Sequence, residues 1–136
     1  MEVSYYAKYG IVKHFSEQML LSCDTQEIGC NGGNPARSMN WLRNNGGLTS
    51  EDEYPYTSGV TGETGSCISG YQSSSPPAAP LNVIGVKPKS DIHLEAAIQL
   101  SGVTILMIAD SLVFQLYTGG LSTHPRVEVA VQIIVW

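Results

Sequence analysis

The side chains best suited to chemistry in this sequence are three cysteines, Cys23, Cys30 and Cys67. An odd number leaves at least one of them without a disulfide partner in the chain. No Cys-x-x-Cys pair occurs, and none of the three histidines is spaced to complete a metal site with the cysteines. We therefore expect no metal and no cofactor. We favour a disulfide or a buried thiol over a reactive one, because a reactive thiolate needs a helix N-terminus or a nearby histidine.

A glycine-rich segment surrounds the second cysteine, with the sequence Gly29-Cys30-Asn31-Gly32-Gly33. Glycine adopts positive φ without strain and lets another chain approach the backbone closely. Two interpretations remain open at this point. The segment is either a binding loop or only the turn that precedes the next helix.

Short helices and turns must position these residues in the first half of the chain. Four features are predicted: a helix within residues 2–13 that stops at Gly10, a second helix capped by Ser16 and ended by Cys23, a third from Pro35 through Leu42, and turns over residues 49–72. Because residues 49–72 have so little regular structure, a disulfide would be a natural way to stabilise them.

The second half is richer in β-branched residues and follows a linker-like Ser/Pro/Ala stretch at residues 73–80. We place a subdomain boundary there, which divides the chain into residues 1–78 and 79–136. The pattern beyond it predicts a strand at 81–86, a helix at 90–100, a strand at 103–108, a short helix or turn at 113–117 and a strand at 127–136.

The amino-acid composition excludes some classes of binding partner. The 136 residues carry 12 acidic and 7 basic side chains, a formal net charge of -5, so the basic surface that nucleic acid requires is absent. The longest apolar runs are too short to cross a bilayer, and no signal peptide is recognisable at the start. We expect a globular domain that binds neither nucleic acid nor membrane.

Five segments resemble the papain-like cysteine peptidases in their order and spacing. They are Phe15–Asp24, Gly29–Gly33, Gly46–Leu48, Glu53–Tyr56 and Cys67, and two later segments, 114–120 and 130–133, agree with them. The resemblance implies an α+β, two-lobed fold. Residues 1–78 would form a partial helical left lobe that lacks its central helix, and residues 79–136 the start of a β-barrel-like right lobe. It also suggests a lysosomal or secreted parent protein.

The resemblance implies roles for the three cysteines. In relatives, the cysteine that matches Cys23 bonds the one that matches Cys67. The cysteine that matches Cys30 bonds one upstream, for which this sequence has no counterpart. A Cys23–Cys67 disulfide and a free thiol at Cys30 are therefore expected.

The same resemblance leaves the chain without catalytic residues. The family's nucleophile, in a Cys-Gly-Ser-Cys-Trp type signature, would precede Met1, and its orienting Asn would follow Trp136. Alignment places Val129, which carries no titratable group, at the position of the catalytic histidine. His124 is a poor substitute, because the five-residue offset turns its side chain to the other face of a strand. We expect a family sequence truncated at both ends.

Part of a binding surface is expected to survive. By resemblance, Gly32 and Gly33 would pair their backbone with an extended peptide, and Pro35 and Ala130 would line the pocket for its second residue. The leading interpretation is an inactive fragment of a cysteine peptidase, with peptides or proteins as partners. The alternatives are a peptide-binding pseudoenzyme, a frame slip near Thr123 that removed the histidine, and a chain with no independent function.

Overall fold

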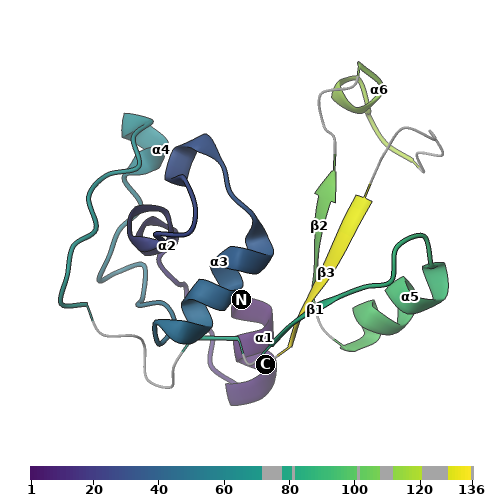
Figure 1. The fold of residues 1–136 in the computed structure, drawn as a ribbon, viewed down its shortest axis with the longest axis horizontal. Coiled ribbons are helices and arrows are strands. Elements are labelled where there is room, and N and C mark those ends of the chain that lie inside the picture. The colour runs from purple at the N-terminus through teal and green to yellow at the C-terminus, as the bar shows by residue number, and fades with distance from the viewer. Residues whose placement is uncertain (72–77, 81, 101, 108–111, 121–128, 136) are drawn as a thin grey trace. The chain divides into compact units, whose positions relative to one another are not determined.

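The computed structural model describes residues 1–71, 78–80, 82–100, 102–107, 112–120 and 129–135. The chain forms two compact units, one of Met1–Ile84 with Ile134–Trp136 and the other of Gly85–Ile133. Figure 1 shows helices in both units, and the strands at residues 82–85 and 129–135 each contain residues of both. The division into residues 1–78 and 79–136 stays a prediction.

The first unit is built from short helices whose ends follow local sequence signals. Helix α1 (Glu2–Tyr9) ends at Gly10, the predicted stop, which adopts φ 69°. Helix α2 (Glu17–Cys23) is capped by Ser16, whose hydroxyl accepts the Met19 N–H at 2.9 Å. Helix α3 (Pro35–Asn44) begins at the expected proline.

Two short helices were not predicted. The glycine-rich segment contains a 3-10 turn, η1 (Gly29–Asn31), and the predicted run of turns contains a one-turn helix, α4 (Ser58–Thr61). Helix α4 forms because its first amides find a partner from far along the chain. The Gln18 carboxamide oxygen accepts the Thr57 and Ser58 N–H groups at 2.9 and 2.8 Å.

The second unit carries helices α5 (Asp91–Leu100) and α6 (Leu112–Gln115). Strands β1 (Asn82–Gly85), β2 (Val103–Met107) and β3 (Val129–Val135) form a sheet in the order β1-β3-β2. Strands β2 and β3 are antiparallel, with Val103 opposite Ile133 and Met107 opposite Val129. Residues 127, 128 and 136 of the predicted last strand lie outside the described residues.

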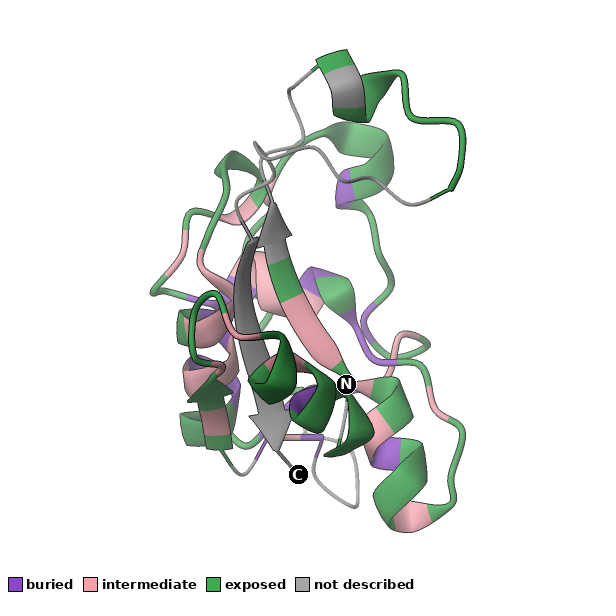
Figure 2. Cartoon of the chain, turned by 90° about the vertical axis from the view of Figure 1, so that its right-hand side faces the viewer, coloured by how far each residue is buried: buried purple, intermediate pink, exposed green. Residues whose placement is uncertain are grey.

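The core of the first unit is aromatic. Tyr5 and Leu42 are fully buried, and the Tyr5 ring meets Phe15 edge-on with 4.9 Å between centroids. The other members of the cluster are Cys23, Trp41, Leu48, Tyr54 and Ala78. Figure 2 shows buried positions both on helices and on the segments between them, and a mostly exposed surface on α5, where Ala97 is the buried residue. No described helix has the length and apolarity needed to cross a membrane.

A buried polar network joins α2 to the turns around α4. Gln18 is 2% exposed, and its amide nitrogen lies within hydrogen-bonding distance of the Ser58 hydroxyl at 2.8 Å, the Ser22 hydroxyl at 2.9 Å and the Thr64 carbonyl at 3.0 Å. The Ser16 hydroxyl adds a second tie by donating to the Tyr54 carbonyl at 2.6 Å. Side chains from α2 therefore satisfy backbone groups that the turns cannot satisfy themselves.

The disulfide Cys23–Cys67 is present, and it joins positions with a sequence separation of 44. It connects the end of α2 to the turns that follow α4. The remaining cysteine, Cys30, is a free and exposed thiol.

Replacing Cys23 and Cys67 together by serine should lower the free energy of unfolding by about 3–4 kcal/mol, because the disulfide restricts a long loop in the unfolded chain. Urea unfolding followed by circular dichroism measures the difference. The exposed Cys30→Ser substitution is the matched control and should change stability by less than about 0.5 kcal/mol. Equal stability of the double variant and the wild type would contradict the assignment.

Gln18→Leu should destabilise the chain by roughly 2 kcal/mol or more, because it leaves the buried Ser58 amide and the partly buried Thr57 amide without an acceptor, and a buried amide of this kind costs about 1–3 kcal/mol. The same urea titration detects the loss. Gln26→Leu, at an exposed position, is the control and should be nearly neutral. Similar effects of the two substitutions would show that the Gln18 network does not stabilise the fold.

Candidate functional site

The glycine loop, which we define as Gly29–Asn34, lies between α2 and α3. Its turn is closed by hydrogen bonds from Gly32 N–H to the Gly29 carbonyl at 3.1 Å and from Ile28 N–H to the Gly32 carbonyl at 3.2 Å. Gly32 has φ 114° and ψ 179°, a conformation that side chains disfavour. At its end, the Asn34 side chain caps α3 by accepting the Ala36 N–H at 2.9 Å.

Thr64 holds the loop from one side. Its hydroxyl oxygen accepts the Cys30 N–H at 3.1 Å, and a Cβ placed on Gly29 would overlap the Thr64 side chain. Thr64 is itself anchored, because its carbonyl accepts the Ser22 hydroxyl at 2.7 Å and the Gln18 amide. The loop thus rests on the same polar network that organises α4.

Glu27 holds the loop from the other side. One carboxylate oxygen accepts the Asn34 N–H at 2.8 Å and an Arg37 Nη2 hydrogen at 2.9 Å, and the other forms an ion pair with Arg37 Nε at 2.6 Å. The hydrogen bond from Arg37 is the largest influence that lowers the pKa of Glu27 below its usual range, so the carboxylate is ionised at neutral pH.

Gly33 presents free backbone to solvent. Neither its N–H nor its carbonyl is hydrogen-bonded to another described residue, and Gly33 is exposed. A Cβ on the neighbouring Gly32 would meet nothing within 4 Å, so the space over this part of the loop is open. The segment therefore offers one donor and one acceptor to an incoming chain.

A hollow of about 220 Å³ lies beside the loop. Its lining combines the apolar Leu20 and Leu21 with the polar Asp24, Glu27 and Ser38 and the backbone of Gly29, Gly32 and Gly33. Asp24 is 7% exposed, and its Oδ2 has no hydrogen-bond partner among the described residues. A second hollow, of about 310 Å³, is lined by Tyr54, Pro55, Tyr71 and neighbouring polar residues.

The other predicted site residues belong to different units. Pro35 opens α3 in the first unit and is half-buried. Ala130 lies in β3, opposite Leu106, and Val129 is opposite Met107. That Pro35 and Ala130 line one pocket stays a prediction, as does the assignment of Val129 to the place of a catalytic histidine.

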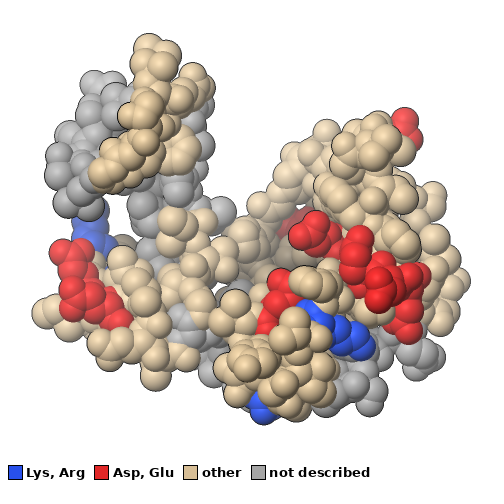
Figure 3. Space-filling model, turned by 180° about the vertical axis from the view of Figure 1, so that it is seen from behind, with Lys and Arg blue, Asp and Glu red and all other residues tan. Residues whose placement is uncertain are grey.

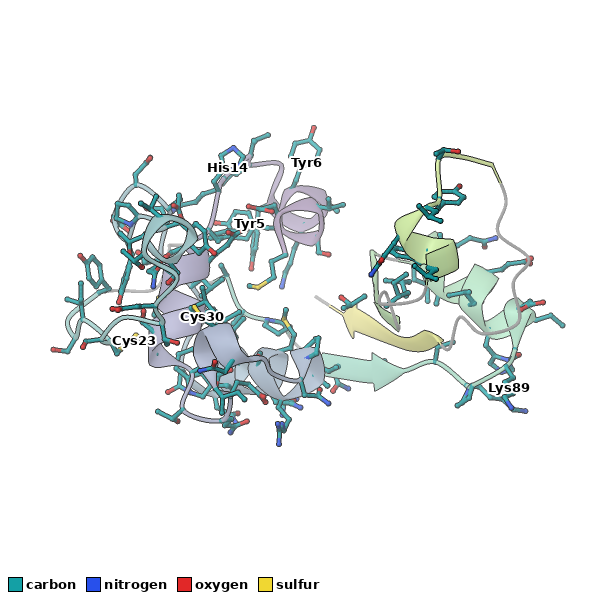
Figure 4. All side chains as sticks on the ribbon, turned by 90° about the horizontal axis from the view of Figure 1, so that it is seen from above. Tyr5, Tyr6, His14, Cys23, Cys30 and Lys89 are labelled. Atoms are coloured by element: carbon teal, nitrogen blue, oxygen red, sulfur yellow. A yellow bond between two sulfur atoms is a disulfide. The ribbon has the colours of Figure 1, made fainter. Side chains whose placement is uncertain are left out.

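The described residues contain no assembled thiol and imidazole pair. His14 lies 3.7 Å from Glu2, His93 lies 2.6 Å from the Ser90 hydroxyl, and Figure 4 shows His14 well apart from Cys30. His124 lies outside the described residues. Within the same part of the chain, no group of three or more His, Cys, Asp or Glu side chains gathers to hold a metal ion.

Acidic side chains gather over one face of the first unit (Figure 3), in keeping with the net charge of -5.

Three residues that build the site were not identified from the sequence: Glu27, Thr64 and the cap Asn34. The Asn-Pro pair at the start of α3 is a helix-start signal that points to Asn34. Nothing local indicates Glu27 or Thr64, because Arg37 and Cys30, their partners, lie 10 and 34 residues away.

Sequence comparison finds relatives along the whole chain. A family model described as "Papain family cysteine protease" matches residues 1–136. Cysteine proteinase 5 of Dictyostelium discoideum is 32% identical over 125 residues, which cover 92% of this chain and 35% of that protein. Zingipain-1 of Zingiber officinale is 34% identical over 108 residues, covering 79% and 46%. The chain thus spans between a third and a half of these two relatives.

Solved structures agree on the fold. A Carica candamarcensis cysteine protease, crystallised in complex with E-64, superposes with a TM-score of 0.73 at 25% identity over 96% of this chain and 61% of that one. The proform of the ragweed pollen cysteine protease Amb a 11 superposes with a TM-score of 0.76 at 24% identity, over 90% of this chain and 36% of its own. The predicted partial, papain-like α+β fold is confirmed.

Gly29→Ala should destabilise the chain by about 2 kcal/mol or more, because Gly29 combines φ 55° with direct packing against Thr64. Gly10→Ala is the matched control. Gly10 has a similar φ of 69° and open space around it, so alanine there should cost only the roughly 1 kcal/mol of left-handed backbone. Thermal unfolding compares the two, and equal losses would show that Thr64 does not confine the loop.

Proposed function

The chain belongs to the papain family of cysteine proteases, and from this premise we propose that its glycine loop binds an extended segment of a peptide or protein substrate. The whole protein would hydrolyse a peptide bond through a cysteine thioester. The 136 residues by themselves would bind peptide without cleaving it.

The free backbone of Gly33 is the observation that carries the binding proposal. An extended peptide satisfies an exposed N–H and carbonyl by pairing as a further strand would. The open space at Gly32 lets a peptide approach without meeting a side chain. Pro35 and Ala130 would contribute apolar surface for the peptide's second residue.

The chemistry of hydrolysis requires groups that the described chain does not bring together. A thiolate must attack the carbonyl carbon, a histidine must protonate the departing amine, and water must then release the acyl group from sulfur. Cys30 is the free thiol among the described residues, and the contacts of His14 and His93 lie elsewhere. Without a base beside it, a thiol is a weak nucleophile.

A pseudoenzyme is the second candidate. Val129 favours it, because an aliphatic residue at the expected place of the histidine removes the general base. A protein of this kind would hold peptides with the same glycine loop and never cleave them. Both candidates share the binding step, so that step is the one to test first.

The purified chain should bind a fluorescein-labelled, end-blocked Ala-Leu-Ala-Ala peptide, measured by fluorescence anisotropy. Methylating the backbone nitrogen of the peptide residue that faces Gly33 should raise Kd about two- to tenfold, because a lost hydrogen bond costs about 0.5–1.5 kcal/mol. A scan that methylates each nitrogen in turn identifies the position. Equal affinity for every methylated peptide would contradict backbone pairing.

A fluorogenic peptide assayed with the same preparation should give no turnover, and a thiol-directed peptide probe should label no residue selectively. Turnover that disappears in Cys30→Ser or His124→Ala would show that this chain carries a working active site. Turnover unchanged in both variants would indicate a contaminating protease.

A further inference from the structure

Glu27 holds the backbone to which the proposed function assigns peptide pairing. Its carboxylate lies directly against Gly33, since a Cβ on that glycine would sit 3.0 Å from Glu27 Oε2 and 3.1 Å from its Cβ and Cγ. The same oxygen accepts the N–H of Asn34, the next residue along. A single side chain therefore fixes both the position of Gly33 and the direction of the peptide unit that follows it.

Arg37 fixes the carboxylate in turn. Its guanidinium engages both Glu27 oxygens, with Nε at 2.6 Å from Oε1 and Nη2 at 2.9 Å from Oε2. The Glu27 side chain is only 7% exposed, whereas that of Arg37 is 62% exposed. The ion pair therefore holds an almost buried acceptor in one orientation, and the exposed guanidinium covers it from solvent.

Arg37 occupies a helix position at which a positive charge is unfavourable. Arg37 is in the first turn of α3, where the helix dipole disfavours a cation. Glu27 offsets this by placing a carboxylate at the same helix end and by pairing with the guanidinium. The unfavourable position of Arg37 at the helix N-terminus is thus compensated by its ion pair with Glu27, the side chain that also holds Gly33.

Holding the loop matters because two adjacent glycines are costly to order. Fixing the backbone of one residue costs about 1–2 kcal/mol, and a loop that is already fixed does not incur this cost when the peptide binds. Thr64 restrains the first half of the loop, at Gly29 and Cys30. Glu27 restrains the second half, which contains the free backbone groups.

We propose that Glu27, oriented by Arg37, is a positioning residue that keeps the Gly33 backbone ready to pair with a peptide. This inference rests on the proposed function, and it concerns the affinity of that same site. Glu27 touches no substrate itself. It acts through Gly33 and Asn34.

The first test measures Kd for the labelled Ala-Leu-Ala-Ala peptide in four variants of the full chain. Glu27→Met removes the acceptor and the charge and should raise Kd about tenfold, which corresponds to the ordering of roughly one residue. Glu27→Gln keeps an oxygen that can accept the Asn34 N–H, so it should restore most of the affinity. Arg37→Met should fall between them, and Glu17→Gln, an exposed glutamate in the first turn of α2, should not change Kd.

Thermal unfolding of the same variants separates positioning from stability. A lower unfolding temperature for Glu27→Met with unchanged Kd would overturn the inference and leave the ion pair a structural one. Equal weakening by Glu27→Gln and Glu27→Met would also overturn it, because the Asn34 acceptor would then be irrelevant.

The second test needs no peptide and follows backbone amide exchange by nuclear magnetic resonance. The reporter is the Gly32 amide, whose acceptor, the Gly29 carbonyl, is untouched by substitution at residue 27. Glu27→Met should speed its exchange at least several-fold, while the Ser16 amide, bonded to the Thr49 carbonyl, should exchange as in the wild type. Unchanged Gly32 exchange would overturn the inference. Failure of the wild type to bind any peptide, with Gly32 exchange accelerated in Glu27→Met, would instead overturn the proposed function alone.

Discussion

The buried carboxamide of Gln18 is the contact on which the first unit depends. Its oxygen accepts two consecutive amides at the start of α4, and its nitrogen is directed at the Ser58 and Ser22 hydroxyls and the Thr64 carbonyl. The segment from Glu51 to Tyr71 contains one four-residue helix and is otherwise irregular, so it pairs few of its own backbone groups. The side chain of Gln18 supplies those partners from α2, and the Cys23–Cys67 disulfide ties the same two regions together covalently.

Thr64 connects the hydrogen-bond network of Gln18 to the glycine loop. Thr64 is held by its carbonyl and in turn holds the loop by its hydroxyl, at the amide of Cys30. The opposite half of the loop is held by Glu27, which precedes the loop, and by Arg37, which lies in α3. The loop is thus irregular in backbone geometry and yet restrained from both sides. This combination suits a binding segment, because glycines provide access and side chains outside the loop provide order.

Binding and bond cleavage place different demands on such a fold. Pairing with a peptide needs only backbone groups held in one place, and the first unit provides them within residues 27–37 and 64. Cleavage needs a thiolate, a base and an oxyanion site brought together within hydrogen-bonding distance. The chain belongs to a family whose members are cysteine proteases, and it spans less than half of the two curated relatives compared with it. Peptide binding can therefore be tested on this chain separately from peptide cleavage.

Local signals in the sequence determined most of the helices and the family. Ser16, Pro35 and Gly10 mark helix ends through capping, fixed φ and positive φ, and each of these effects involves only a few neighbouring residues. The ordered motifs around the cysteines indicated the papain-like fold and the Cys23–Cys67 pairing. Only the tertiary structure decided what surrounds the glycine loop. Apart from Ser22, which lies one helical turn from Gln18, the partners of Gln18, Thr64 and Glu27 lie between 7 and 46 residues away along the chain, so no periodicity or capping rule points to them. Helix α4 was missed for the same physical reason, since its first amides are satisfied by a side chain from another helix and not by their own sequence neighbours.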